Sequence, residues 1–396
     1  MLPYNNDSLL QYNIDFGDMA RDFSDACYFA TIPFMRVRSF DNLRIFACIL
    51  VVLVHVSAQG ISASAVDSVA FAFCQCCNIL AFSGVSIFVM MSGALALRPG
   101  KESSVRDVVV KRFLYFLGLY FLWKGIYLFF DLLRAGQGVS GSGIKQLVLD
   151  LIGGRGFYHL WYLPMIAFLS LLVPLIRQGV QKKEVCLLYL VPFAVLALLF
   201  PTLFYFEFPF KYLLMDFLGQ FETEYFLGYL GYFILGHFLY QWKEDQTNGK
   251  RTALVIAGVV ALVFGCVFGV LRSRADGVFF DGYSSPLSFT NLLTSSTIYV
   301  LFINPKDQSG KAGKAVKDRP PVQNEPENRP LVQNVAGLTL GIYLIHPMVI
   351  ELLKDCGVFR IGDIAVLSVL LYVAIVTVLS AALVFLFGKV LLMIKR

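Results

Sequence analysis

The sequence predicts an all-α protein, a polytopic membrane helix bundle of about ten transmembrane helices with both termini in the cytoplasm. The first observation is composition: 57% of the 396 residues are hydrophobic and only 15% are charged. Soluble domains average about 45–50% apolar and about 25% charged residues. The other two observations are a series of long apolar runs and the way basic residues alternate between them. The net charge of +6 is assigned to cytoplasmic loops, and no nucleic-acid partner is expected.

Ten apolar runs of a length suited to crossing a bilayer define the expected helices. The sixth is the least regular, because it is rich in glycine and contains His237. The last is long enough to be tilted in the bilayer. The expected spans are 42–60, 72–97, 112–133, 159–177, 185–206, 221–241, 252–271, 286–304, 335–353 and 364–388.

Basic residues between these spans fall mainly on one side of the membrane. With ten spans, 22 Lys and Arg lie on the side of the N-terminus and 8 lie on the other side. Cytoplasmic loops carry such an excess. A missed or an extra span would destroy the alternation, so the count supports ten spans with both ends in the cytoplasm.

Two segments differ from this membrane domain, which covers residues 36–396. Residues 1–35 are acidic and form no cleavable signal peptide. They are interpreted as a loosely ordered extension or as the product of a misassigned start upstream of Met35. The cytoplasmic loop 305–334 is rich in Pro, Lys and Asn and contains the related sequences RPPVQN and RPLVQN. This composition predicts disorder.

The first candidate site lies on the expected first helix, where Arg44 precedes His55 by eleven positions. At about 100° per residue the two side chains share one face, and His55 lies roughly 16 Å deeper. Ionisable side chains inside a bilayer usually face the bundle interior and mark a functional site. The alternative is that Arg44 extends to the headgroups and that His55 is a hydrogen-bonded packing residue.

Three further patterns carry candidate residues. Lys111 and Arg112, in the basic cluster after the second span, are suited to binding phosphates, although the cluster also fits ordinary loop topology. Trp161 and Tyr162 in HLWYLP are either interfacial anchors or part of an acceptor-sugar groove. His346 precedes a proline that interrupts helical hydrogen bonding, either at a functional break or at a simple kink.

No metal site is expected. Cys74, Cys76 and Cys77 form a C-x-C-C motif, but no histidine is close in sequence and the other cysteines lie mostly in apolar runs. Small apolar packing residues explain them better.

Four segments occur in an order that resembles the acyltransferase-3 family of bacterial inner-membrane O-acyltransferases. They are FDNLRIFACILVVLVH at 40–55, GVSIFVMMSGALAL at 84–97, HLWYLPMIAFLSLLVPLIR at 159–177 and LGIYLIHPM at 340–348. The chain looks most like the branch that acetylates enterobacterial surface polysaccharide precursors. The resemblance implies an acyl-CoA donor, acetyl-CoA by default, which is a substrate and not a tightly bound cofactor. It implies a sugar-hydroxyl acceptor on a glycan or a lipid-linked precursor.

In this resemblance His55 takes the position of the family's helix-1 histidine, and Arg44 that of its helix-1 arginine. The chain departs from the family at two places: it lacks the pair of arginines four residues apart near 106–112, and Ser86 replaces a frequent acidic residue. The resulting hypothesis places CoA phosphates on Arg44, Lys111 and Arg112 and makes His55 the catalytic base. Trp161, Tyr162 and His346 are assigned to the acceptor.

Two alternatives remain open. One is succinyl or other acyl transfer to a periplasmic glucan. The other is a polysaccharide or small-molecule transporter whose path is lined by Arg44 and His55.

Overall fold

The computed structural model describes residues 38–394, with gaps at 101–103, 137–148, 154–156, 222, 246, 304–330 and 359–364. The N-terminal segment 1–35 and most of the predicted loop 305–334 therefore lie outside the described residues. The end of that loop needs a correction, because a helix already begins at Leu331. Val332 starts an apolar periodic pattern that runs on into the following span, and residues 331–334 join it.

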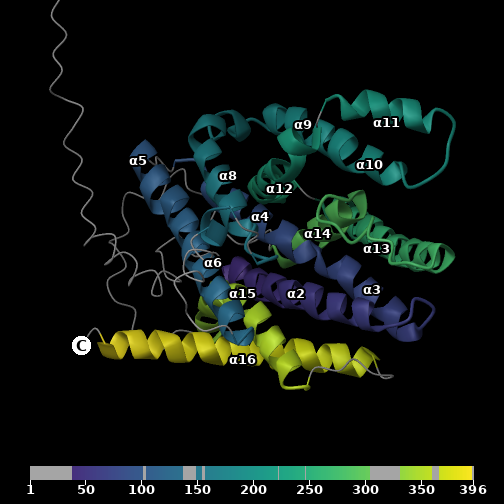
Figure 1. Ribbon diagram of the computed structural model, residues 1–396. Helices are drawn as coiled ribbons and strands as arrows, with labels where there is room; N and C mark the ends of the chain where they lie inside the picture. Colours follow the sequence, from purple (N-terminus) through teal and green to yellow (C-terminus); the bar gives the residue numbers. More distant parts are fainter. Residues whose placement is uncertain are drawn as a thin grey trace, which may run out of the picture.

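The described residues form helices and contain no strand, which confirms the all-α prediction (Figure 1). The elements, in chain order, are α2 (Arg38–Ala63), α3 (Val69–Ala81), α4 (Ser83–Ala96), α5 (Val105–Val108), η2 (Val109–Leu114), α6 (Tyr115–Arg134), α8 (Tyr162–Ile176), η3 (Gly179–Gln181), α9 (Lys183–Pro192), η4 (Phe193–Leu199), α10 (Phe200–Leu203), α11 (Lys211–Gly219), α12 (Thr223–Gln241), η5 (Lys243–Asp245), α13 (Asn248–Asp276), α14 (Phe289–Phe302), α15 (Leu331–Asp355) and α16 (Ala365–Ile394).

Seven helical segments among the described residues are long and apolar enough to cross a bilayer. They are 39–63, 69–96, 105–134, 183–203, 248–276, 332–355 and 367–390. Two shorter apolar helices, α8 and α14, coincide with predicted spans. Helix α12 covers a further predicted span but is bent at Gly228, whose backbone is not helical. The protein is thus a multi-pass membrane protein, and the count of ten stays a prediction.

Glycines allow α4 and α12 to pack backbone against backbone. A Cβ atom on Gly93 would lie 1.8 Å from the carbonyl oxygen of Phe233, and one on Gly236 would lie 2.0 Å from that of Met90. Only residues without a side chain permit such an approach. Gly93 is therefore a point of close helix approach in the segment 84–97. This contact sets the position of α4, which forms part of the wall of the cavity described below.

Helix α2 runs through the interior of the bundle and packs against α3, α4, α15 and α16 (Figure 1). The Asn78 amide on α3 donates to the Val54 carbonyl at 3.0 Å and to the Ser57 hydroxyl at 3.1 Å. These bonds satisfy polar groups in the apolar interior. They fix the stretch of α2 that carries His55.

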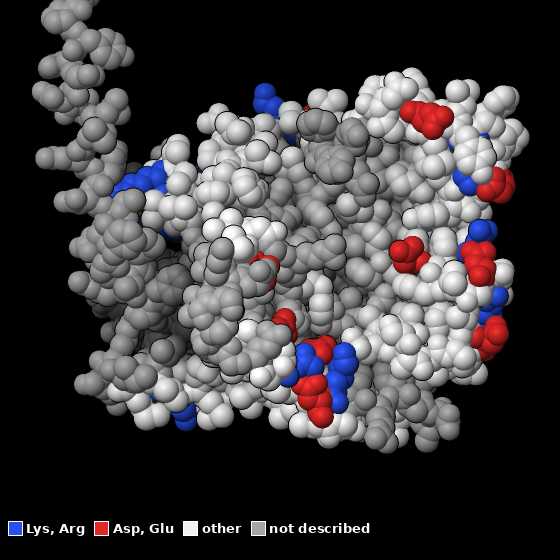
Figure 2. All heavy atoms as spheres, in the orientation of Figure 1, with Lys and Arg blue, Asp and Glu red and all other residues white. Residues whose placement is uncertain are grey.

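Charged pairs join α6 and α15 at the C-terminal end of each helix. The Arg134 guanidinium forms two hydrogen bonds of 2.6 Å to the carboxylate of Asp355 and lies 3.2 Å from Glu351. In the view of Figure 2, by contrast, much of the described surface is uncharged; Lys, Arg, Asp and Glu form small groups at the right-hand edge and in the lower middle, and further Lys and Arg lie at the upper left and the top. Broad uncharged areas are what a lipid-facing surface requires.

Candidate active site

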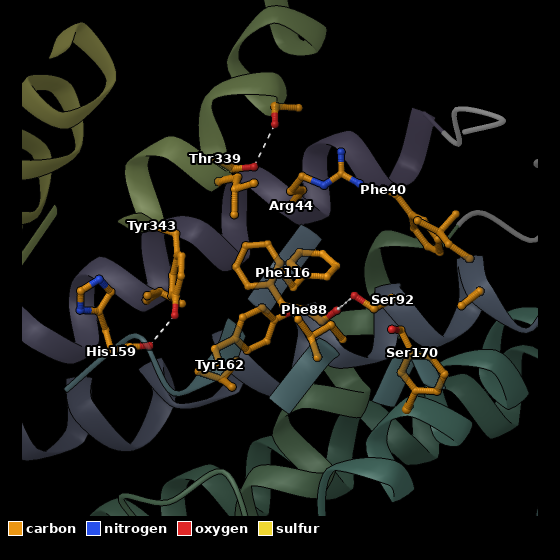
Figure 3. A pocket seen from close by; sticks show the side chains of 18 of the residues that line it. Phe40, Arg44, Phe88, Ser92, Phe116, His159, Tyr162, Ser170, Thr339 and Tyr343 are labelled. Carbon is orange, nitrogen blue, oxygen red and sulfur yellow. Dashed lines mark hydrogen bonds between the residues drawn. The ribbon is translucent and has the colours of Figure 1, made fainter. Parts of the chain in front are cut away.

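A cavity of about 380 Å³ lies between α2, α4, α8, α15 and the segment from η2 into α6. Six of the seven residues singled out from the sequence line it: Arg44, His55, Lys111, Arg112, Trp161 and Tyr162. They come from three regions of the chain that are separated by more than forty residues. Figure 3 shows the cavity from close by, with His159 and Tyr343 toward one end and Ser92 and Ser170 toward the other. The fold therefore brings these candidates together in one place.

Basic side chains mark one end of the cavity. Arg44 lies near the start of α2, 3.8 Å from Asp41, a carboxylate that is itself buried. Lys111 and Arg112 follow in η2, just before α6 begins. Lys111 pairs with Asp107 at 2.7 Å, and its side chain is 71% exposed. Arg112 is half-buried. The cavity thus offers cations to an anionic ligand at the end where α2 and α6 begin.

Histidines mark the other end. The His55 ring lies 5.1 Å from the His346 ring, and the His346 ring lies 5.6 Å from that of His159, measured between centroids. The chain has four histidines, and these three, from distant parts of the sequence, form one cluster. Tyr158 covers His55, with ring centroids 4.9 Å apart. Such a concentration of imidazoles beside a cavity is suited to proton transfer.

The turn that carries His159 is held by hydrogen bonds and aromatic contacts. The Tyr343 hydroxyl donates to the His159 carbonyl. Tyr127, on α6, stacks on Phe157 at 4.1 Å and donates its hydroxyl to the Leu344 carbonyl at 2.7 Å. These contacts connect α6, the turn and α15, so the histidine cluster rests on packed elements.

His346 differs in position from the other sequence candidates. It is fully buried on α15 and does not line the cavity, but lies behind His55. Its Nδ1 atom is 3.0 Å from the Ile342 carbonyl, one turn earlier in the same helix. Of the two alternatives for Pro347, a functional break or a simple kink, the structure shows no break of the helix, because α15 continues through Pro347 to Asp355. A direct contact with a bound substrate is therefore harder for His346 than for His55.

Aromatic side chains line the middle of the cavity. The Tyr162 ring packs against the rings of Phe88 and Tyr343, with centroids 6.4 Å and 5.7 Å away (Figure 3). Trp161 is 40% exposed and lies 5.2 Å from the Tyr229 ring. Trp161 therefore borders both the cavity and the protein surface, whereas Tyr162 is part of the wall.

Sequence reasoning missed His159 and Tyr343, both of which line the cavity. His159 opens the motif HLWYLP, so its position beside Trp161 was a usable signal. Tyr343 lies three positions before His346 on the same helix, a spacing that places both on one face. The hydrogen-bond partner of Ser86 was not predicted from the sequence either. The Ser86 hydroxyl accepts a hydrogen bond of 2.7 Å from the Asn291 amide on α14, and the same amide donates to the Tyr232 hydroxyl.

The described residues contain no group of three or more His, Cys, Asp or Glu placed to hold a metal ion. The arrangement instead pairs cations for an anionic ligand with an imidazole that can accept a proton. The two groups are separated along α2 by roughly 16 Å. An elongated anionic molecule could thus be held at one end and react at the other.

Comparison with known proteins agrees with this geometry. A family of acyltransferase domains, the acyltransferase-3 family, matches residues 37–389, which is nearly the whole chain. No curated protein and no solved structure matches the chain significantly. The chain belongs to the acyltransferase-3 family, and we conclude that it is a membrane acyltransferase.

Proposed function

We propose that the protein transfers an acetyl group from acetyl-CoA to a hydroxyl of a cell-surface polysaccharide or of a lipid-linked sugar precursor, in the inner membrane of a bacterium. The observation that carries this proposal is the single cavity that joins Arg44, Lys111 and Arg112 to His55. Such a cavity supplies what acyl transfer from CoA requires: cations for phosphates and a base for a hydroxyl.

The donor lies with its phosphates at the basic end. Arginine binds phosphate through paired N–H groups and stays charged, so Arg44 and Arg112 are the main contacts. Lys111 is more exposed and already pairs with Asp107, so it contributes less. The flexible arm of CoA extends between Phe88, Phe116 and Tyr162 to bring the thioester toward His55. The aromatic walls exclude water, which protects the thioester from hydrolysis.

His55 acts as the general base. It takes the proton of the acceptor hydroxyl while the hydroxyl oxygen attacks the thioester carbonyl carbon. The new C–O bond forms, the C–S bond breaks, and the proton passes from His55 to the departing sulfur. The products are an ester and CoA as a free thiol, and His55 returns to its starting state.

The acceptor reaches His55 beside Trp161 and Tyr162. Trp161 is partly exposed, so a sugar ring can stack on it while one hydroxyl points into the cavity. The excess of basic residues supports a cytoplasmic position for the start of α2, and with it for the donor end. Both termini are then cytoplasmic.

Transfer of label from donor to glycan tests this function. Membranes that contain the wild-type protein are incubated with acetyl-CoA labelled in the acetyl group, and label is counted in the glycan and glycolipid fractions. We expect label in one of these fractions that membranes without the protein do not acquire. If label appears only with succinyl-CoA or another acyl-CoA, the transferred acyl group is not acetyl. No label from any of these donors would contradict the proposal and favour a transporter.

A further inference from the structure

The His346 side chain has one nitrogen that is bonded and one that is not. Nδ1 lies 3.0 Å from the carbonyl oxygen of Ile342. A carbonyl oxygen only accepts hydrogen bonds, so Nδ1 carries the proton and donates it. Nε2 is then a bare acceptor. It is buried, and none of the described residues provides a hydrogen bond to it.

A buried acceptor without a donor costs free energy, so the surroundings of this atom need an explanation. The ring contacts of His346 are with side chains of the site itself. His55 on α2 and His159 in the turn before α8 are the two imidazoles whose rings approach it. Tyr343, on its own helix, lies 6.3 Å away between ring centroids.

The distance between His55 and His346 suits a hydrogen bond. Two imidazole rings joined by an N–H···N bond of about 2.9 Å have centroids about 5 Å apart. The observed separation is 5.1 Å, and the two ring planes are tilted by 32°. For this bond to form, the His55 ring must turn so that one of its N–H groups faces Nε2 of His346.

We propose that His346 is a positioning residue for the acyl transfer, and that its Nε2 atom accepts a hydrogen bond from His55. This inference rests on the proposed function, in which His55 is the base. The bond holds the proton on the His55 nitrogen that faces His346. It thereby leaves the lone pair of the other His55 nitrogen directed at the acceptor hydroxyl. It also stabilises the imidazolium that forms when His55 takes the hydroxyl proton.

The atom balance of the reaction is unchanged by this role. His346 keeps its own Nδ1 proton throughout and accepts no second one. The hydroxyl proton moves to His55 and from there to the thiolate of CoA, as the C–O bond forms and the C–S bond breaks. His346 therefore affects how fast the transfer occurs, and not what is consumed.

Two amide substitutions separate this role from simple packing. In His346→Asn the side-chain nitrogen takes the place of Nδ1, and the bond to Ile342 can form, but no acceptor reaches the position of Nε2. In His346→Gln the amide extends one bond further and offers its oxygen near that position. His237→Gln is the matched control, since His237 is equally buried but lies on α12, bonded to the Val180 carbonyl and outside the cavity wall.

We expect His346→Asn to lower kcat at least about tenfold with little change in the KM for acetyl-CoA, and His346→Gln to recover much of the loss. His237→Gln keeps the wild-type kcat. Each variant is assayed per amount of protein inserted in the membrane. Wild-type kcat in His346→Asn would overturn the inference, and so would equal losses in the Asn and Gln variants. Failure of both variants to accumulate would make His346 a packing residue, which also overturns it. Absence of transfer by the wild type would instead contradict the proposed function.

Discussion

Lys111 and Arg112 are adjacent in the sequence but differ in their surroundings. Lys111 is mostly exposed and pairs with Asp107, whereas Arg112 is half-buried, and both reach the cavity wall. An exposed charge is screened by water and salt, and a partly buried one is screened less. The two residues therefore contribute unequally to the binding of an anionic donor.

We predict that Arg112→Ala raises the KM for acetyl-CoA by about tenfold or more, because charge-assisted hydrogen bonds are among the strong ones. Lys111→Ala raises it by less than about fivefold. Steady-state kinetics with varied donor measure both. Lys250→Ala, which removes an exposed charge on α13 away from the cavity, serves as the control. A larger effect from Lys111 than from Arg112 would refute this division of roles.

At the residue scale, part of the site could be predicted from the sequence. The shared position of Arg44 and His55 could be predicted because helical geometry alone places them on one face of a single helix. The contact between His55 and His346 could not be predicted, because 291 positions separate the two residues and only tertiary packing brings them together. The position of His159 in the motif HLWYLP was a usable signal, but its contact with His346 was not, because that contact also depends on tertiary packing.

At the scale of elements, apolar length predicted where helices occur but not where they are interrupted. The predicted span 72–97 consists of α3 and α4, which meet at Phe82, and the span 185–206 contains the π-helical stretch η4. Such breaks depend on how neighbouring helices pack. Helix α11 was missed because its nine residues are too few to register as a span.

The contact between α4 and α12 provides a prediction at this scale. Gly93→Ala places a Cβ atom 1.8 Å from the Phe233 carbonyl oxygen, so the two helices must separate. We expect a loss of about 1–3 kcal/mol in the free energy of unfolding, the usual range for overpacking. Denaturant titration of the purified protein in detergent measures it.

Gly249→Ala is the matched control for Gly93→Ala. Gly249 lies in the first turn of α13, where an added Cβ meets no atom within 4 Å. Alanine there favours the helix slightly, so stability stays the same or increases. Equal destabilisation by both substitutions would show that the close approach of α4 and α12 does not limit stability.

For the whole molecule, composition and charge predicted a multi-pass helical membrane protein, and the family match supports an acyltransferase. The acceptor could not be predicted, because glycan recognition depends on the shape of a surface assembled from several elements. The orientation in the membrane rests on the excess of basic residues on one side, and a native cysteine can test it.

Cys356 follows the end of α15 and is exposed. The predicted topology places it outside the cytoplasm, because α15 begins after the lysine-rich loop. A membrane-impermeant maleimide added to intact cells should therefore label the protein, provided that the reagent has crossed any outer membrane. Labelling should fall in Cys356→Ser, because Cys356 is the one exposed cysteine among the described residues; Cys48, Cys74 and Cys186 are buried, and Cys76, Cys77 and Cys266 are half-buried within α3 and α13. Labelling of Cys356 only after the inner membrane is permeabilised would reverse the orientation of α15.

The central claim is that one cavity binds the donor at its basic end and performs chemistry at His55. The most direct test measures acetyl-CoA binding and acetyl transfer side by side for the purified wild type, His55→Ala and His237→Ala. The account predicts that His55→Ala binds acetyl-CoA with wild-type affinity and transfers at least about 100-fold more slowly, while His237→Ala matches the wild type in both. Transfer by His55→Ala at the wild-type rate would contradict it.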